Sequence, residues 1–338
     1  MSPHPPRSRR PSRFTSKLSR ATWLLALAGL IVLAFGHIAA SSQTRDKGVH
    51  EASGLARCTT WPGHYWSHAD SFNPAELYLL DDNGTIQSSY SIAGIRNVDW
   101  EDITSDQQGF LYLGDIGNNN GKRKKLVVYR IPEPDPSIQG YSKKLQVERA
   151  LYFRYPDQSL PNARPSDFDA ESLFWANDHL YLLTKHTKDT KTVLYQFPKL
   201  KHSAKRDRSR RSRNSTITLK RISEFDLGGS ERIAFGGRAT SADVSDDGRY
   251  LALLSYHALF IFDLQFDRHN PLANPLRRFD LNMWTSQQCE GVAWSSTKKS
   301  IPLPEILIIN EGGAVFRIPH PLTVQEPSKL FYQVHDYP

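Results

Sequence analysis

Five short segments of this chain repeat one pattern, in which a small or acidic residue and then an aliphatic residue open an apolar run. The segments are Ser53-Gly-Leu55, Glu101-Asp-Ile103, Glu171-Ser-Leu173, Ala242-Asp-Val244 and Glu290-Gly-Val292, with their aliphatic residues 48, 70, 71 and 48 positions apart. Recurrence of one supersecondary unit at such a period is typical of a β-propeller. Because equivalent positions in a propeller converge on one axis, residues far apart in the sequence are expected to form one polar ring.

Each repeat divides into four predicted strands with alternating or continuous apolar patterns, bounded by turns such as Asp82-Asn83-Gly84. The predicted blades cover residues 53–92, 100–155, 170–227, 240–281 and 289–334. They leave no room for a sixth unit of similar size. We therefore predict an all-β, five-bladed propeller of four-stranded blades over residues 45–338, preceded by one N-terminal transmembrane or signal helix.

The N-terminus has the pattern of an export signal or a membrane anchor. Residues 1–20 carry six Lys or Arg side chains and no acidic one, and the apolar stretch 21–40 follows. About 20 apolar residues are enough to cross a bilayer. We favour an uncleaved anchor, which predicts a single-pass cell-membrane protein with its C-terminal domain outside the cytoplasm. Signal cleavage near Ala39-Ala40-Ser41, giving a secreted protein, stays open.

A second basic block, residues 199–214, interrupts the third predicted blade. We predict that it is a disordered, solvated loop. The alternative is that residues 199–213 contact an anionic lipid or polymer surface. The chain has a net charge of +8, but the part outside the tail and this block carries −5. The positive charge therefore belongs to two appendages, and no nucleic-acid partner is expected.

The two cysteines, Cys58 and Cys289, are predicted to remain separate thiols, although export would permit a disulfide. Their positions in the repeat differ by six residues along parallel strands, which is roughly 20 Å. A disulfide needs Cα atoms within about 7 Å of each other.

The repeat alignment predicts an acidic ring on the inner strands. The reference positions are Ser53, Glu101, Glu171, Ala242 and Glu290, and two residues earlier stand Glu51, Asp99, Asp169, Thr240 and Gln288. If the inner strands line a channel, six carboxylates point at one axis, where they must be protonated or neutralised by a cation. Oxygen-only ligands suit Ca²⁺. The alternative is that these acids accept backbone hydrogen bonds and brace neighbouring blades.

The ends of the second strands predict a ligand site on the adjoining face. These ends carry Asp70, Asp115, Lys185, Tyr256 and Glu311, and the following loop of the second blade adds Asn118 and Asn119. A second strand runs antiparallel to the first, so its end shares a face with the start of the first. Carboxylates, a lysine and a phenol around one channel mouth form a plausible pocket for a polar ligand.

Several of these segments resemble a family of exported bacterial propeller proteins of unassigned function. The resemblance rests on Glu51-Ala-Ser-Gly-Leu55, on the Asp-Trp-Glu-Asp of 99–102 and on the Gly-Asp-Ile-Gly-Asn-Asn of 114–119, and it covers roughly residues 50–315. It implies the fold and an export pattern rather than an activity.

The chain is more distantly similar to the calcium-activated apyrases, five-bladed propellers that hydrolyse nucleoside diphosphates. Those proteins hold calcium with serines and glutamates on their inner strands. The resemblance implies Ca²⁺ ligands at Ser53, Glu101, Glu171 and Glu290. The fourth blade departs from the pattern, because Ala242 stands at its reference position.

Two functions from different classes stay open. One is a non-catalytic propeller that binds a divalent cation in its acidic channel and an unknown small-molecule or protein ligand on the adjoining face. The other is a metal-dependent hydrolase of phosphoesters or phosphoanhydrides, with Asp99 or Asp115 as general base and Lys185 on the developing anion. The sequence contains no nucleophile elbow, P-loop, HExxH or zinc-type Cys/His spacing, which favours binding.

Overall fold

The computed structural model describes residues 48–106, 108–138, 143–200, 215–228, 237–256, 258–281, 287–295, 305–319, 321–323 and 332–333. The chain divides into two units, Met1–Asp46 and Lys47–Pro338, and the described residues belong to the second. The predicted tail (1–20), the predicted membrane segment (21–40) and residues 201–214 of the basic block lie outside them, so those predictions remain untested. Among the described residues, no helix is long and apolar enough to cross a membrane.

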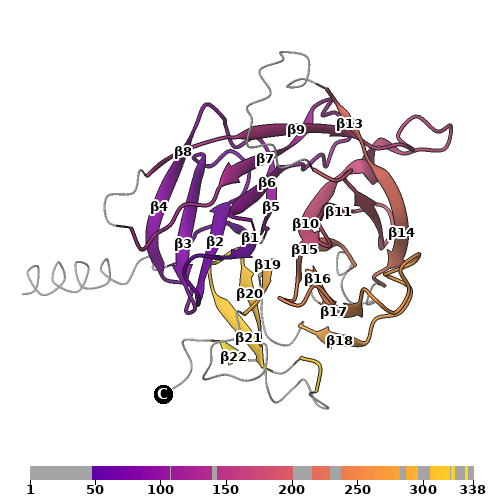
Figure 1. Cartoon of the computed structure of the whole chain (residues 1–338). Helices are drawn as coiled ribbons and strands as arrows, with labels where there is room; N and C mark the ends of the chain where they lie inside the picture. Colours follow the sequence, from indigo (N-terminus) through magenta and orange to yellow (C-terminus); the bar gives the residue numbers. More distant parts are fainter. Residues whose placement is uncertain are drawn as a thin grey trace, which may run out of the picture. The chain divides into compact units, whose positions relative to one another are not determined.

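Lys47–Pro338 forms five sheets around an axis, a five-bladed β-propeller (Figure 1). Blade 1 contains β1 (Ala52–Arg57), β2 (His64–Ala69), β3 (Glu76–Asp81) and β4 (Ile86–Ala93); blade 2 contains β5 (Trp100–Ser105), β6 (Phe110–Asp115), β7 (Leu126–Pro132) and β9 (Arg149–Arg154). Blade 3 contains β10 (Ala170–Ala176), β11 (His179–Thr184), β12 (Lys191–Gln196) and β14 (Lys220–Asp226); blade 4 contains β15 (Ala239–Val244), β16 (Tyr250–Ser255), β17 (Ala258–Asp263) and β18 (Arg277–Asp280). Blade 5 contains β19 (Cys289–Trp294), β20 (Glu305–Asn310), β21 (Val315–Pro319) and β22 (Tyr332–Gln333). The predicted all-β, five-bladed fold with four-stranded blades is confirmed.

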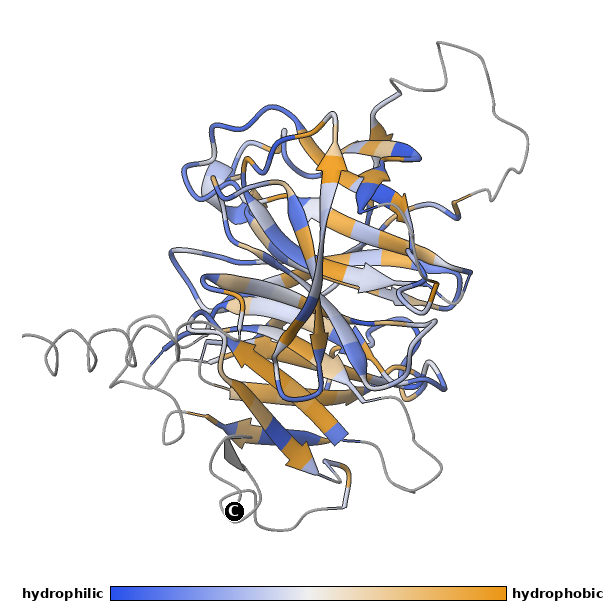
Figure 2. Ribbon diagram, turned by 90° about the vertical axis from the view of Figure 1, so that its left-hand side faces the viewer, coloured by the Kyte–Doolittle hydropathy of each residue, from blue (hydrophilic) through white to orange (hydrophobic). Residues whose placement is uncertain are grey.

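Apolar side chains between neighbouring blades form the core. In β16 every residue after Tyr250 is buried, because both faces of an inner sheet region are covered by other blades. Trp66, Trp100 and Trp294 are fully buried in these layers. Burial of each such ring contributes about 1.5–3 kcal/mol or more. Figure 2 shows broad orange, apolar segments on the strands of the blades.

Two blades gain a fifth strand from the repeat that follows them, which the sequence patterns do not predict. β8 (Lys144–Gln146) pairs in parallel with β4, and β13 (Ile217–Thr218) pairs in parallel with β9. Both short strands lie in the connections between the third and fourth strands of their own blades. Each connection therefore reaches back and covers the outer edge of the preceding blade, which protects that edge from other strands.

Every inner strand has a β-bulge close to its start. The unpaired residues in β5, β10, β15 and β19 are Glu101, Glu171, Thr240 and Glu290, and in β1 the register shifts between Ser53 and Leu55. A bulge bends its strand and re-aims a side chain. The repeated acidic position is therefore a repeated bulge rather than a regular strand position.

The strand pairing corrects the alignment of blade 4. Ala239 pairs with Ser255 as Trp100 pairs with Asp115, so Thr240 corresponds to Glu101. The sequence pattern places Ala242 at this position, two residues too far along. The alignment is misled because Asp243 resembles Asp102, whereas β15 begins at Ala239.

The axis is bridged beneath the starts of the inner strands, so the predicted acidic channel is a cavity at one end. The bridge is the carboxylate of Asp102, which is fully buried and accepts hydrogen bonds from the N–H groups of Leu173 (2.8 Å) and Ala242 (3.3 Å). Asp102 and Asp243, which are not among the predicted ring acids, thus brace neighbouring blades; Asp243 accepts from the N–H of Trp294 at 2.8 Å. Within the predicted ring, Asp169 accepts the backbone N–H of Asn118 from blade 2 at 2.5 Å.

Cys58 and Cys289 are both buried free thiols, which confirms the prediction that they do not pair. Burial raises the pKa of Cys58 to about 11 and that of Cys289 to about 12. Both side chains therefore stay in the neutral, unreactive thiol form at physiological pH.

Candidate functional site

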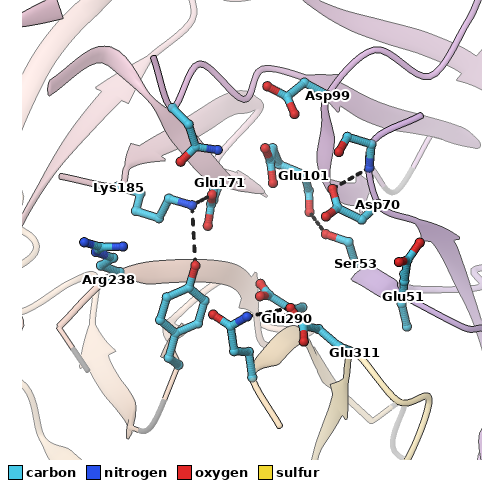
Figure 3. Close-up of a pocket in the computed structure, with 15 residues that line it drawn as sticks. Glu51, Ser53, Asp70, Asp99, Glu101, Glu171, Lys185, Arg238, Glu290 and Glu311 are labelled. Carbon is cyan, nitrogen blue, oxygen red and sulfur yellow. Dashed lines mark hydrogen bonds and ion pairs between the residues drawn. The ribbon is translucent and has the colours of Figure 1, made fainter. Parts of the chain in front are cut away.

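A cavity of about 330 Å³ lies at the end of the axis where the inner strands begin (Figure 3). It is lined by Glu51, Ala52, Ser53, Asp70, Ser71, Asp99, Glu101, Asn119, Glu171, Lys185, Arg238, Tyr256, Gln288, Glu290 and Glu311. All five blades contribute. Of the candidate site and ring residues predicted from the sequence, the cavity lining lacks Asp115, Asn118, Asp169, Thr240 and Ala242.

Asp115 and Asn118 lie behind the cavity wall and support it. Asp115 is buried and forms an ion pair with Arg123 at 2.5 Å. The side-chain oxygen of Asn118 accepts a hydrogen bond from the backbone N–H of Arg123 at 2.8 Å. The backbone N–H of Asn118 donates to the Asp169 carboxylate. These contacts fix the loop that carries the lining residue Asn119.

Negative charge outweighs positive charge among the lining side chains. Seven of them are carboxylates, and the cationic ones are Lys185 and Arg238. Blades 1, 2 and 5 supply the acidic side of the cavity, which consists of Glu51, Asp70, Asp99, Glu101, Glu290 and Glu311. Lys185 and Arg238 come from blades 3 and 4 and lie together on the opposite side (Figure 3). The cavity therefore has an acidic side and a cationic side.

Lys185 is the positive charge held deepest in the cavity, with a side chain only 6% exposed. It follows directly after β11, and its backbone N–H donates to the carbonyl of Asp169 at 2.8 Å. The ammonium contacts the Glu171 carboxylate and lies 3.5 Å from the hydroxyl of Tyr256. Glu171 thus has an internal counter-ion.

Glu101 is in the opposite situation. It is 8% exposed, and its carboxylate has no hydrogen-bond or ion-pair partner among the described residues. Gly117 makes room for it, because a Cβ at that position would collide with the Glu101 carboxylate. Burial raises the pKa of Glu101 well above its ordinary value; Lys185 opposes this, and nearby carboxylates add to it.

The surrounding carboxylates show the same excess of negative charge. Burial, reinforced by Glu311 and Asp70, raises the pKa of Glu290 to about 8. Burial also raises the pKa of Asp99 to about 6, although Arg123 lies 3.7 Å away and opposes the shift. These groups hold protons at pH values where an exposed carboxyl is ionised.

Two asparagines hold the acidic side of the rim in place. Asn97 Nδ2 donates to the backbone carbonyl of Asp70 at 2.7 Å, and Asn73 Nδ2 donates to the Glu51 carboxylate at 2.8 Å. These two hydrogen bonds therefore hold the loop that follows β2 in place. The Asp70 and Glu51 side chains consequently face the same space (Figure 3).

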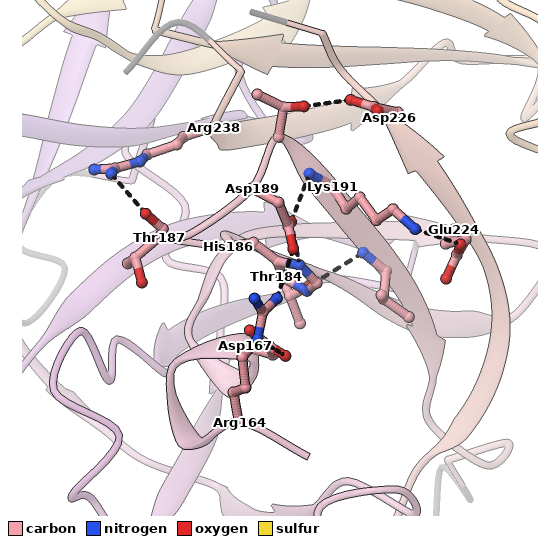
Figure 4. Close-up of polar contacts among 12 residues, drawn as sticks. Arg164, Asp167, Thr184, His186, Thr187, Asp189, Lys191, Glu224, Asp226 and Arg238 are labelled. Carbon is pink, nitrogen blue, oxygen red and sulfur yellow. Dashed lines mark hydrogen bonds and ion pairs between the residues drawn. The ribbon is translucent and has the colours of Figure 1, made fainter. Parts of the chain in front are cut away.

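A second polar cluster supports the loop that follows Lys185 (Figure 4). Arg164 lies just before the short 3₁₀ helix η2 (Pro165–Phe168) and pairs with Asp167 at 2.9 Å and with Asp189 at 2.5 Å. Asp189 in turn accepts from His186 Nδ1 at 2.8 Å. This loop is also bonded to the cavity wall, because Arg238 donates to the carbonyl of Thr187 at 3.2 Å.

Arg238 lines the cavity but is not among the residues predicted from the sequence. Because Ala239 corresponds to Trp100, Arg238 occupies the position of Asp99 in blade 4. The sequence alignment of blade 4 is shifted by two residues, so it places Thr240 rather than Arg238 at the position of Asp99. With the correct register, this ring position holds Arg238 in blade 4 beside three acids and Gln288 in the other blades.

The donor set suits a hard cation, because carboxylate, hydroxyl and amide oxygens are the ligands that Ca²⁺ takes. Among the described residues, however, no three His, Cys, Asp or Glu side chains are already close enough together to hold a metal ion.

No protein-family model matches the chain, and no curated protein matches it. Among solved structures, the chain is similar to the PQQ-bound form of an aldose sugar dehydrogenase from Streptomyces coelicolor. The two are 10% identical with a TM-score of 0.42, over 78% of this chain and 89% of that one. The propeller fold rests on the strand pairing itself. The similarities to exported bacterial propellers and to apyrases remain predictions.

Proposed function

We propose that this protein is a cation-binding propeller whose cavity takes a divalent cation, Ca²⁺ by preference, together with a polar ligand at the same mouth. The observation that carries the proposal is the partnerless, buried carboxylate of Glu101 inside a cavity with seven carboxylates and two cationic side chains. Uncompensated buried charge is costly, and a bound cation removes that cost.

The ion-binding residues in this proposal are Glu101, Glu171 and Glu290, with Ser53 as a neutral ligand. The three glutamates are equivalent bulge residues of blades 2, 3 and 5 and line one cavity. The Ser53 hydroxyl donates its proton to the carbonyl of Glu101 at 2.6 Å, which leaves its lone pairs for an ion.

The polar ligand would contact Asp70, Asn119, Tyr256 and Glu311, which line the same mouth. These side chains offer a phenol, an amide and two carboxylates rather than an apolar surface. The proposed ligand is therefore small and hydrogen-bonding, in keeping with the size of the cavity.

Calorimetric titration of CaCl₂ into the full-length protein tests the cation site. We expect Glu101→Gln and Glu290→Gln each to weaken Ca²⁺ binding by about tenfold or more, because each removes a charged ligand. Glu224→Gln is the matched control, since Glu224 is exposed on β14, away from the cavity. Absence of binding heat and of any thermal shift with millimolar Ca²⁺ in the folded protein would reject the proposal.

A second candidate is metal-dependent hydrolysis of phosphoesters or phosphoanhydrides, which the position of Asp99 favours. Asp99 lines the cavity, and its pKa of about 6 suits a general base at neutral pH. Asp115 does not line the cavity, so Asp99 takes this role, with Lys185 opposite it. Ca²⁺-dependent release of phosphate by the wild type, abolished in Asp99→Asn, is the expected signature; no turnover on either substrate class would eliminate this candidate.

We also propose that the propeller is exported and held at the cell membrane by residues 21–40. The support is the basic flank followed by about 20 apolar residues. Extraction of membranes at alkaline pH is the test. An anchored protein stays in the membrane pellet, whereas recovery of a shortened, soluble chain would indicate a cleaved signal.

A further inference from the structure

The Lys185 ammonium lies between two carboxylates and is in contact with one of them. It contacts Glu171, whereas Asp169 Oδ2 is 3.9 Å away. Both carboxylates are almost completely buried, with side-chain exposures of 5% for Glu171 and 0% for Asp169. Lys185 thus has a second possible acceptor within about 1 Å of hydrogen-bonding range.

Asp169 is prepared to accept this ammonium. Its Oδ1 already accepts the backbone N–H of Asn118 at 2.5 Å, whereas its buried Oδ2 has no hydrogen-bond partner in the described part of the chain. A buried carboxylate oxygen without a donor is an uncommon arrangement in a folded protein. The Lys185 backbone is already bonded to the Asp169 carbonyl, so the side chain alone has to move.

We propose that Lys185 is a tethered cation that occupies Glu171 in the ion-free protein and shifts to Asp169 Oδ2 when a divalent cation binds. This inference rests on the proposed function. On Glu171 a divalent ion carries one more positive charge than the ammonium that it replaces, whereas a monovalent ion carries the same charge. Lys185 is therefore a specificity-determining residue that selects divalent over monovalent cations.

Removal of the tethered cation should strengthen ion binding. We expect Lys185→Met to bind Ca²⁺ about tenfold more tightly than the wild type, because a competing charge has left the cavity. It should also bind K⁺ in competition with Ca²⁺, more strongly than we expect of the wild type. Lys185→Gln is a second variant with a polar side chain, and circular dichroism establishes that each variant folds. Lys191→Met is the control, since Lys191 carries the same charge in an exposed pair with Glu224.

A double-mutant cycle separates the shift from simple electrostatics. Asp169→Asn keeps Oδ1 as acceptor for Asn118 and removes the charge that would receive Lys185. We expect it to weaken Ca²⁺ binding in the wild-type background and to have little further effect in Lys185→Met. If Asp169→Asn weakens Ca²⁺ binding equally in both backgrounds, Asp169 acts directly on the ion, and the proposed movement of Lys185 to Asp169 is wrong.

The outcomes distinguish this inference from the function on which it rests. If the wild type binds Ca²⁺ and Lys185→Met binds it no more tightly, with unchanged selectivity against K⁺, the inference is wrong and the cation site stands. If neither folded protein binds Ca²⁺, the cation site itself is wrong.

Discussion

Glu101 and Asp102 are consecutive residues of β5, and both are buried, yet their surroundings are opposite. The Asp102 carboxylate accepts four hydrogen bonds, from the N–H groups of Ile103, Leu173 and Ala242 and from the hydroxyl of Ser241. The Glu101 carboxylate lines the cavity and has no partner among the described residues. The number of hydrogen bonds, rather than burial, therefore distinguishes the Asp102 carboxylate, which holds strands together, from the Glu101 carboxylate, which lines the cavity.

The same contrast separates the two ends of the axis. At the far end, Arg57 donates to the carbonyl of Val244 at 2.7 Å and lies 3.5 Å from the Asp243 carboxylate. At the cavity end, six acidic-side carboxylates from three blades face two cationic side chains. Charge is thus neutralised where blades 1 and 4 meet, and left in excess where the cavity opens.

The largest expected effect is the loss of the Asp102 bridge. Asp102→Ala leaves three backbone N–H groups and a hydroxyl without their acceptor, which should lower the free energy of unfolding by about 3–5 kcal/mol. Urea unfolding followed by tryptophan fluorescence measures it. Asp102→Asn, which keeps one carbonyl acceptor, should lose less. An unchanged urea midpoint in Asp102→Ala would contradict the conclusion that Asp102, unlike Glu101, stabilises the fold.

Arg57→Met tests the neutralised end. Loss of the guanidinium leaves the buried Asp243 carboxylate without its counter-ion, which should cost about 3 kcal/mol. Burial already raises the pKa of Asp243, and Arg57 opposes this shift. The loss should therefore be largest at neutral pH and smaller in acid, where Asp243 is protonated. A loss that does not depend on pH would indicate that Arg57 acts through packing instead.

Glu290→Gln tests the end with excess charge. The pKa of Glu290 is raised from 4.5 to about 8, so between these pH values the folded state binds a proton that the unfolded chain has released. The stability from this proton is fully present below pH 4.5 and is lost as the pH rises through 8. In EDTA at pH 9, Glu290→Gln should therefore be more stable than the wild type by about 2 kcal/mol.

At pH 5 the two proteins should unfold at nearly the same urea concentration. Glu224→Gln is the control. Ion pairs, chiefly with Lys191, lower the pKa of Glu224, so the shift in pKa has the opposite sign to that of Glu290. A stability difference between Glu290→Gln and the wild type that does not grow with pH would contradict an uncompensated carboxylate at this site.

The main strands are predictable from the sequence, and the short added strands are not. Alternation and turn residues such as Asp82-Asn83-Gly84 are local signals, and they place the predicted ends of blade 1, residues 53 and 92, within a residue of the observed Ala52 and Ala93. β8 and β13 contain three and two residues, which is too few for any alternation to appear. Their pairing depends on contacts between blades.

The site is predictable as a set of acids, but its geometry is not. The pattern around Ala242 misaligns blade 4 by two residues, because Asp243 resembles Asp102, and this error hides Arg238. The contrast between Glu101 and Asp102 is also invisible in the sequence, because it depends on donors from blades 3 and 4. Both depend on the exact register between strands distant in the sequence.

Substitution of Ser53 should have the smallest effect on stability. Its hydroxyl contributes to the fold, as Asp102 does, and also to the cavity lining, as Glu101 does. It donates to the Glu101 carbonyl at 2.6 Å and also lines the cavity. Ser53→Ala should lower the free energy of unfolding by about 1 kcal/mol through the lost hydrogen bond. It should also weaken Ca²⁺ binding, but less than Glu101→Gln, because a hydroxyl is a neutral ligand. Loss of stability with unchanged Ca²⁺ affinity would place Ser53 with Asp102 in the fold and remove it from the proposed ion site.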